Sequence, residues 1–317
     1  MVEKRFCAQI SRDAGDPFIG TAARADTWLL IEYRGAWGRN EIESSELPDQ
    51  VKSWIDRIQK PHVRTQLIKQ DRHRSGHIIV YVAITQEQRQ ALYRFQFACY
   101  EDLLSLDLEA LRNGHGRYED YRYYDPLFLV CTHGKHDACC AKFGMPVYSE
   151  LERLAGEFTW QSSHVGGDKF AANVLCFPHG IYYGRVAVSE VESIIASYWQ
   201  LQLYLKKYRG RTCYQPMVQA ADYFVRERTG QTDLRAFQLL EVRQITAERW
   251  WVSFESARDS TRHCLFLQEQ VNEAPPYRTT CHADRKHISK AYHLSSYEIL
   301  EPGQTYSSDY QASLSLR

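Results

Sequence analysis

Two stretches of the chain, FLVCTHGKHDACCAKFG at residues 128–144 and SSHVGGDKFAANVLCFPHGIYYGRV at residues 162–186, decide which fold to expect. The first opens within the apolar run LFLVC (127–131), which is typical of a fully buried strand, and leads through a polar loop into a helical pattern over residues 139–155. In the second, two short apolar runs flank His179-Gly180, which predicts a β-hairpin.

The segments around these stretches complete one folding unit. FTWQSS at 158–163 reads as a strand between the helix and the hairpin. The amphipathic run over residues 189–208 predicts a closing helix, with Ser189 as its N-cap and Glu192 completing a capping box. The resulting order is β-α-β-β-β-α, that of a thioredoxin-like layer structure, so an α/β fold is expected.

The first 122 residues repeat this order. Strands are expected at 28–33, 65–70, 77–84 and 92–100, with helices at 47–60 and 101–114, the second ending at Gly114. When WLLIEY is aligned with LFLVC, Glu32 takes the place of Cys131. The first half is therefore either a degenerate thioredoxin-like repeat or an unrelated α/β domain.

From residue 209 the pattern changes. A helix ending at Gly230 precedes several strand-like runs that predict a small antiparallel sheet, and the polar tail after residue 302 is expected to be frayed. We expect an N-terminal α/β domain, a thioredoxin-like domain and a C-terminal β extension, at residues 1–122, 123–208 and 209–317.

The overall composition excludes several classes of protein. The chain has 39 basic and 39 acidic residues among 317, a balance unlike that of proteins that bind nucleic acid or membrane surfaces. No apolar run is long enough to cross a membrane, and the N-terminus lacks the apolar core of a signal peptide. We expect a soluble cytoplasmic protein whose nine cysteines are reduced, buried, catalytic or metal-bound.

Four residues in the two stretches form a candidate metal-ligand set: Cys131, Cys140, His164 and Asp168. The first cysteine ends a strand and the second begins a helix, whose N-terminus favours a thiolate. Gly166 and Gly167 allow a sharp turn between the histidine and the aspartate. Thiolates and imidazoles that converge from two loops are the ligands an iron–sulfur cluster requires. No C-x-x-C motif is present, which argues against a dithiol oxidoreductase.

The same residues carry a resemblance to a known family. The CTHGKHDACCA and HVGGDKFAANVL segments, with AQISRDAGDPFIGTAARADTWLLIE near the start, resemble the sucrase/ferredoxin-like family, and residues 126–205 resemble thioredoxin-like [2Fe–2S] ferredoxins. The resemblance implies a [2Fe–2S] cluster held by two cysteines and by the two histidines of an H-V-G-G-H motif. It also implies a protein that transfers electrons to a redox partner or senses redox state.

This chain departs from the family pattern at one ligand, because Asp168 stands where the second histidine is expected. Two ferric ions, two sulfides, two thiolates and one carboxylate leave a net charge of −1, so a lower potential than in bis-histidine relatives is expected. Alternatively Asp168 does not bind and the cluster is labile or lost, in which case His133, His136 or His179 would complete the set.

Other functions remain open. The same four residues would make a chemically sensible structural zinc site, and the protein would then be a zinc-binding or cluster-free interaction protein. A lone cysteine nucleophile would make it a thiol enzyme. A hydrolase is disfavoured, because nothing places two carboxylates across a sugar site and no G-x-S-x-G motif occurs. A non-catalytic electron carrier is therefore the leading prediction.

The remaining cysteines are interpreted as structural. Cys139 adjoins Cys140 and is assigned to a helix face outside the site, and Cys7 is taken as a lone structural thiol. TTCHADRKH at 279–287 is a second Cys/His cluster, and one interpretation places Cys281 near the candidate metal centre. Its ligand spacing does not support that interpretation, so a loop is the favoured prediction for Cys281.

Overall fold

The computed structural model describes residues 6–71, 76–271, 280–282 and 290–304. The strands are β1 (Thr27–Glu32), β2 (Val63–Lys69), β3 (Ile78–Thr85), β4 (Gln90–Phe97), β5 (Arg122–Tyr123), β6 (Leu127–Cys131), β7 (Thr159–Ser162), β8 (Val174–Phe177), β9 (Ile181–Tyr183), β10 (Tyr208–Arg211), β11 (Phe237–Gln244), β12 (Arg249–Ser256), β13 (Arg262–Val271) and β14 (Lys290–Leu300). The α-helices are α1 (Cys7–Asp13), α2 (Asp49–Ile58), α3 (Leu108–Asn113), α4 (Ala138–Ala155), α5 (Val191–Trp199) and α6 (Pro216–Thr229).

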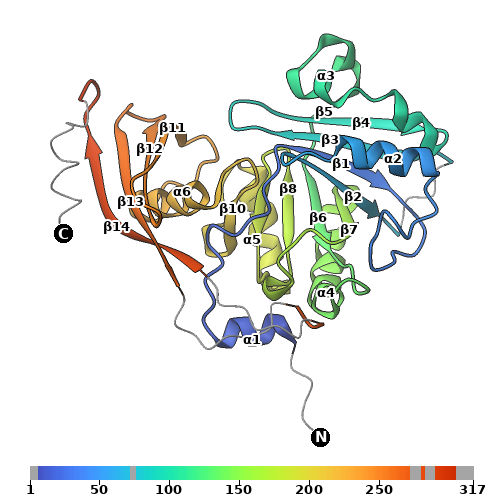
Figure 1. Cartoon of the computed structure of the whole chain (residues 1–317), viewed down its shortest axis with the longest axis horizontal. Coiled ribbons are helices and arrows are strands. Elements are labelled where there is room, and N and C mark those ends of the chain that lie inside the picture. The colour runs from blue at the N-terminus through green and yellow to red at the C-terminus, as the bar shows by residue number, and fades with distance from the viewer. Residues whose placement is uncertain (1–5, 72–75, 272–279, 283–289, 305–317) are drawn as a thin grey trace, which may run out of the picture.

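Two sheets organise these elements (Figure 1). A ten-stranded mixed sheet has the order β10-β9-β8-β6-β7-β2-β1-β3-β4-β5, and a four-stranded antiparallel sheet has the order β11-β12-β13-β14. The predicted α/β class and the C-terminal antiparallel sheet are thus confirmed.

The half that contains the candidate site has the predicted β-α-β-β-β-α order. Strand β6 lies parallel to β7 and antiparallel to β8, which pairs with β9, so the spatial order is β7-β6-β8-β9. Helix α4 connects the parallel pair and α5 follows the last strand. This is the connectivity of the thioredoxin fold.

The first half repeats that connectivity. Strand β1 lies parallel to β2 and antiparallel to β3, which pairs with β4, and α2 connects the parallel pair. The spatial order β2-β1-β3-β4 matches that of the second half strand for strand. Glu32 ends β1 as Cys131 ends β6, which agrees with the degenerate-repeat interpretation.

The two halves share one sheet and one of their hydrophobic clusters, while each half also has a cluster of its own. Strands β2 and β7 pair antiparallel, with Ile68 opposite Ser162. Alternate residues of each strand point to the same face of the sheet. On that face Trp28 of the first half belongs to the same hydrophobic cluster as Leu129 and Tyr182 of the second half. The predicted division near residue 122 therefore does not interrupt the main sheet.

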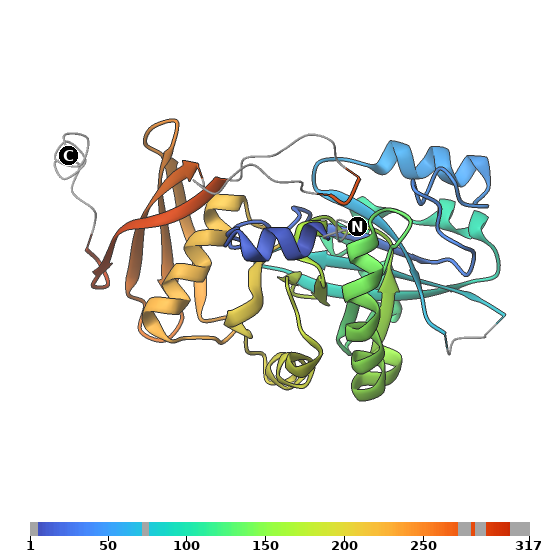
Figure 2. The same ribbon diagram turned by 90° about the horizontal axis from the view of Figure 1, so that it is seen from below.

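The C-terminal region is attached to this sheet by a strand that the sequence analysis did not predict. Strand β10 pairs antiparallel with β9 at the end of the sheet, and α6 follows it and packs against the four-stranded sheet. Gly230 adopts φ 69° and ends α6 as expected. Helix α1 was also not predicted, and Figure 2 shows it lying between α6 and α4.

Two helix predictions were wrong in their limits. Residues 101–114 form a 3₁₀ helix (Tyr100–Ser105) and then α3, because Asp107 accepts a hydrogen bond from the Ala110 amide and starts a new helix. The predicted end of that segment at Gly114 is confirmed by its left-handed φ of 75°.

The helix expected over 189–208 ends at Trp199. The Gln202 amide bonds to the Ser197 carbonyl across Leu201, which has φ 57°, and this is a Schellman-type end without glycine. Ser189 is not the N-cap, since a short 3₁₀ turn (Val188–Glu190) precedes the helix. Of the tail expected to be frayed, residues 305–317 lie outside the described part of the chain.

Candidate metal centre

The first candidate loop joins β6 to α4. Cys131 is the last residue of β6 and Cys140 lies in the first turn of α4, and both are buried. Asp137 caps the helix by accepting a hydrogen bond from the Cys139 amide at 2.8 Å. One turn further along, Gly144 packs directly on the backbone carbonyl of Cys131. The loop therefore places the first turn of α4 beside the end of β6, as the spacing of the two cysteines suggests.

The second candidate loop runs from β7 to β8. Gly166 and Gly167 adopt φ values of 99° and 79°, which side chains rarely tolerate, and the turn brings Asp168 back towards His164. The Tyr182 hydroxyl lies 2.9 Å from the carbonyl oxygens of both Val165 and Gly166. A fixed hydroxyl donor thus holds the loop against β9.

All four predicted residues converge between these loops. The side-chain donor atoms of Cys131, Cys140 and His164 all lie within 4.8 Å of one another. Cys140 Sγ lies 3.9 Å from His164 Nδ1 and 3.5 Å from Asp168 Oδ1, and the last two atoms are 3.0 Å apart. Two thiols, an imidazole and a carboxylate therefore form one largely buried group.

Of the three other histidines considered from sequence, only His136 reaches this group. Its ring stacks on that of His164 at 3.6 Å between centroids, and its donor atom lies within 4.8 Å of those of His164 and Asp168. His179 is instead hydrogen-bonded to the Tyr198 hydroxyl at 2.8 Å.

His133 lies in the first loop, and its ring contacts backbone groups next to the site. Its Nδ1 accepts a hydrogen bond from the His164 amide at 3.2 Å, and its Nε2 lies 2.7 Å from the Gly38 carbonyl oxygen. The second contact requires a proton on Nε2, so both ring nitrogens are engaged with backbone groups. His133 thus ties the second loop to the first half of the chain.

The charges in this group favour one thiolate. A hydrogen bond from the Cys140 side chain, reinforced by His164, holds the pKa of Cys131 well below its usual range, and the contact with Cys131 raises the pKa of Cys140. Burial raises the pKa of Asp168. Burial alone would lower the pKa of His164, but Cys131 and Asp168 outweigh it and raise that pKa. Of the two thiols, Cys131 is therefore the one whose deprotonation is favoured, and a deprotonated thiol is the form that binds a metal ion.

The sequence of this chain matches a known protein family. The model of the sucrase/ferredoxin-like family matches residues 18–210, which is more than half of the chain. The chain belongs to the sucrase/ferredoxin-like family. The match spans both halves of the main sheet and all four candidate residues.

Two curated relatives of this family member are named altered inheritance of mitochondria protein 32. The protein from Meyerozyma guilliermondii is 31% identical over 104 residues, covering 29% of this chain and 37% of that protein. The protein from Clavispora lusitaniae is 26% identical over 104 residues, covering 30% of this chain and 38% of that protein. The chain thus matches little more than a third of the length of these relatives.

One solved structure, a thioredoxin-like [2Fe–2S] ferredoxin from Aquifex aeolicus, matches 27% of this chain and 91% of its own. The sequence identity is 13% and the TM-score is 0.25. The thioredoxin connectivity described above rests on the strand order of this chain and not on that match.

Sequence analysis missed a second group of cysteines. Cys139 does not occupy an isolated helix face, and Cys7 is not a lone thiol, because their sulfurs lie 3.3 Å apart and Cys281 joins them. The adjacent pair Cys139–Cys140 was the available signal. Successive helical residues point about 100° apart, so each member can enter a different site. Of the second Cys/His segment, residues 279 and 283–287 lie outside the described part of the chain.

Proposed function

We propose that the protein is a one-electron carrier or redox sensor that holds a [2Fe–2S] cluster at Cys131, Cys140, His164 and Asp168. The observation that carries this proposal is the convergence of the first three side chains, from two loops, within 4.8 Å. Membership of the sucrase/ferredoxin-like family supports it.

The donor set suits such a cluster chemically. Two thiolates would hold one iron, and His164 with Asp168 would hold the other, which is the Rieske ligand pattern with one imidazole replaced by a carboxylate. Burial excludes most water from the site, with the Cys131 and Asp168 side chains almost inaccessible. The cluster would supply reversible one-electron chemistry, and the chain's own groups would set its charge and hydration.

A single zinc ion is the second candidate for the same site. Donor atoms that all lie within 4.8 Å of one another also suit one tetrahedral ion, and a Cys₂His site with a carboxylate is an ordinary zinc ligand set. In that case the protein would be a structural or interaction protein without a redox centre. Acid-labile sulfide separates the two candidates, because zinc sites contain none.

A redox partner follows from the proposal and not from the fold. An electron carrier exchanges electrons with a redox protein, so we propose such a partner. None of the helices in the described ranges is long and apolar enough to span a membrane. A cytoplasmic location remains a prediction.

The deciding experiment is iron, zinc and sulfide analysis of the chain purified anaerobically, with a visible spectrum of the same sample. About two irons and two sulfides per chain, with an absorption band bleached by dithionite, are expected. His164→Ala should remove or shift that band because it deletes a ligand. His115→Ala, an exposed histidine on a separate loop, is the matched control and should leave the spectrum unchanged.

A chain that remains free of iron and sulfide after anaerobic reconstitution would refute the cluster. An unchanged spectrum in His164→Ala would remove that residue from the ligand set.

A further inference from the structure

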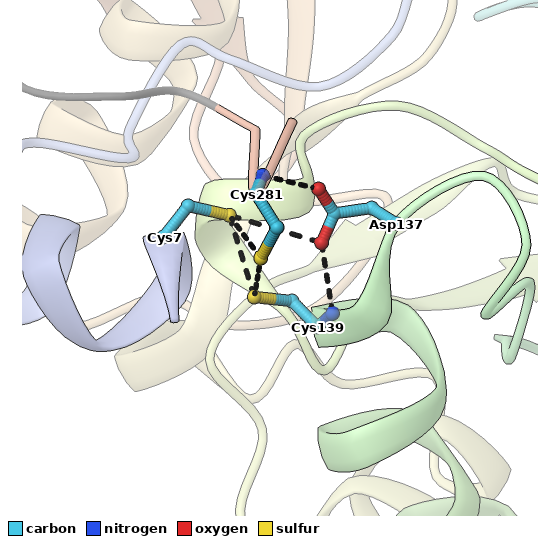
Figure 3. A group of neighbouring side chains, drawn as sticks. All are labelled: Cys7, Asp137, Cys139 and Cys281. Carbon is cyan, nitrogen blue, oxygen red and sulfur yellow. Dashed lines mark hydrogen bonds between the residues drawn. The ribbon is translucent and has the colours of Figure 1, made fainter. Parts of the chain in front are cut away.

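Three cysteines and an aspartate that are far apart in the sequence meet beside the start of α4 (Figure 3). We call this group, made of Cys7, Asp137, Cys139 and Cys281, the three-cysteine site. Cys7 begins α1, Cys139 lies in the first turn of α4, and Cys281 lies in a turn between β13 and β14. The first two thiols and the carboxylate are buried, and Cys281 is half-buried.

The sulfur atoms surround a single point. Cys139 Sγ lies 3.3 Å from the sulfurs of both Cys7 and Cys281, and those two are 3.7 Å apart. Zn–S bonds of about 2.3 Å at tetrahedral angles place neighbouring sulfurs about 3.8 Å apart, so a small expansion would admit one ion. Three sulfurs around one point are the thiolate arrangement of a single tetrahedral ion.

Asp137 supplies the fourth donor. Its Oδ1 lies 3.9 Å from Cys7 Sγ, and Figure 3 shows the carboxylate facing the three sulfurs. The same oxygen accepts from the Cys139 amide at 2.8 Å, while Oδ2 accepts from the Cys281 amide at 2.6 Å. Each carboxylate oxygen has a second lone pair, so these bonds orient the group without using up its capacity to bind a metal.

The surroundings stabilise negative charge on these ligands. The Ala8 amide donates to Cys139 Sγ at 3.4 Å, and the N-terminus of the 18-residue helix α4 lies at the site. Apolar atoms of Ala8 and Ala171, with Phe6 and Phe143 at the edge, cover the sulfurs. Buried thiolates with backbone donors and an apolar cover are typical of structural metal sites.

We propose that the three-cysteine site binds one zinc ion through its three thiolates, with Asp137 as the oxygen ligand. Oxygen and sulfur donors in this number suit zinc, and a closed four-ligand set leaves no position for a substrate. The ion would connect α1 and the turn at Cys281 to the first turn of α4. Because Cys139 adjoins Cys140, this brace would fix the helix start that also presents Cys140 to the candidate cluster.

The test measures both metals in the full chain, purified anaerobically from zinc-supplied cells. Wild type is expected to contain about one zinc per chain, and Cys7→Ser and Cys281→Ser should each lose it. Cys99→Ser, an exposed cysteine, is the matched control and should retain it. Cys131→Ser should lose iron and retain zinc, which separates this proposal from the one for the cluster.

A second measurement reports on the coordination of the metal rather than on its amount. In Cys131→Ser, cobalt(II) added to the zinc-depleted chain should give thiolate-to-cobalt charge-transfer bands and the d–d bands of tetrahedral cobalt. Adding Cys281→Ser, in the half-buried turn, should weaken both sets of bands. Wild type without zinc, a disulfide between two of the three thiols in anaerobic protein, or zinc lost in Cys131→Ser but kept in Cys7→Ser would each overturn the proposal.

Discussion

Gly144 is where the packing of α4 and the geometry of the candidate cluster site can be tested together. A Cβ atom at this position would lie 2.1 Å from the backbone oxygen of Cys131 and 3.2 Å from its carbonyl carbon. Ordinary carbon–oxygen contacts are about 3.3 Å or longer, so Gly144→Ala would force α4 and β6 about 1 Å apart. The clashing atoms are backbone, and no rotamer change can relieve the contact.

The expected loss of stability follows from two opposing effects. Overpacking of a closed core costs about 1–3 kcal/mol, whereas replacing glycine by alanine within a helix gains up to about 1 kcal/mol. We therefore expect Gly144→Ala to lower the free energy of unfolding by about 1–2 kcal/mol. The same displacement moves Cys140, one turn earlier in α4, away from Cys131, so bound iron should also decrease.

Urea denaturation followed by far-UV circular dichroism measures the first effect, and iron content per chain measures the second. Gly116→Ala is the matched control, because a Cβ there meets no atom within 4 Å, and it should change stability by less than about 0.5 kcal/mol. A Gly144→Ala protein with the stability and iron content of wild type would refute the close approach of α4 to the end of β6.

Two further predictions concern pH and redox potential. Burial, with Arg211 and Arg235 nearby, lowers the pKa of His179 to about 3, so the unfolded chain takes up a proton that the folded chain does not. The free energy of unfolding should fall as pH drops below about 6.5, by about 2–3 kcal/mol at pH 4.5. Urea titrations across that pH range should show a smaller decline in His179→Gln. The same decline in the variant and in wild type would contradict this prediction. Asp168→His removes one negative charge at the proposed cluster. A unit charge at about 4 Å and an effective dielectric of 20 is worth about 4 kcal/mol, so the midpoint potential should rise by on the order of 100 mV, whereas an unchanged potential would exclude Asp168 as a ligand.

Local patterns in the sequence predicted most of the main sheet. The run LFLVC forms β6 over its whole length, and the glycines at 114 and 230 end helices in left-handed conformations. Both signals act over a few residues, through burial and backbone sterics. Where a local signal was missing the prediction failed, as at Leu201, a leucine in the conformation usually given to glycine.

The candidate cluster residues could also be found from the sequence. Cys131 and Cys140 are joined by one short strand-to-helix loop, and His164 and Asp168 by one glycine turn, so each pair is fixed locally. The family resemblance then indicated that both pairs bind the same cluster. The stacking of His136 on His164 depends on how the two loops meet and could only be offered as one of several possibilities.

The sequence by itself determined the order of most strands and helices and the identity of the candidate ligands, because these reside in local spacing or in residue type. The departure at Asp168 emerged only from the resemblance to the family. Only the tertiary structure decided that β2 pairs with β7 to join two matching halves, and that Cys7 and Cys281 meet Cys139. These contacts connect residues about 90 to 270 positions apart. The sequence pattern of either partner says nothing about such a contact, since the packing of the whole chain, not local backbone preference, brings the residues together.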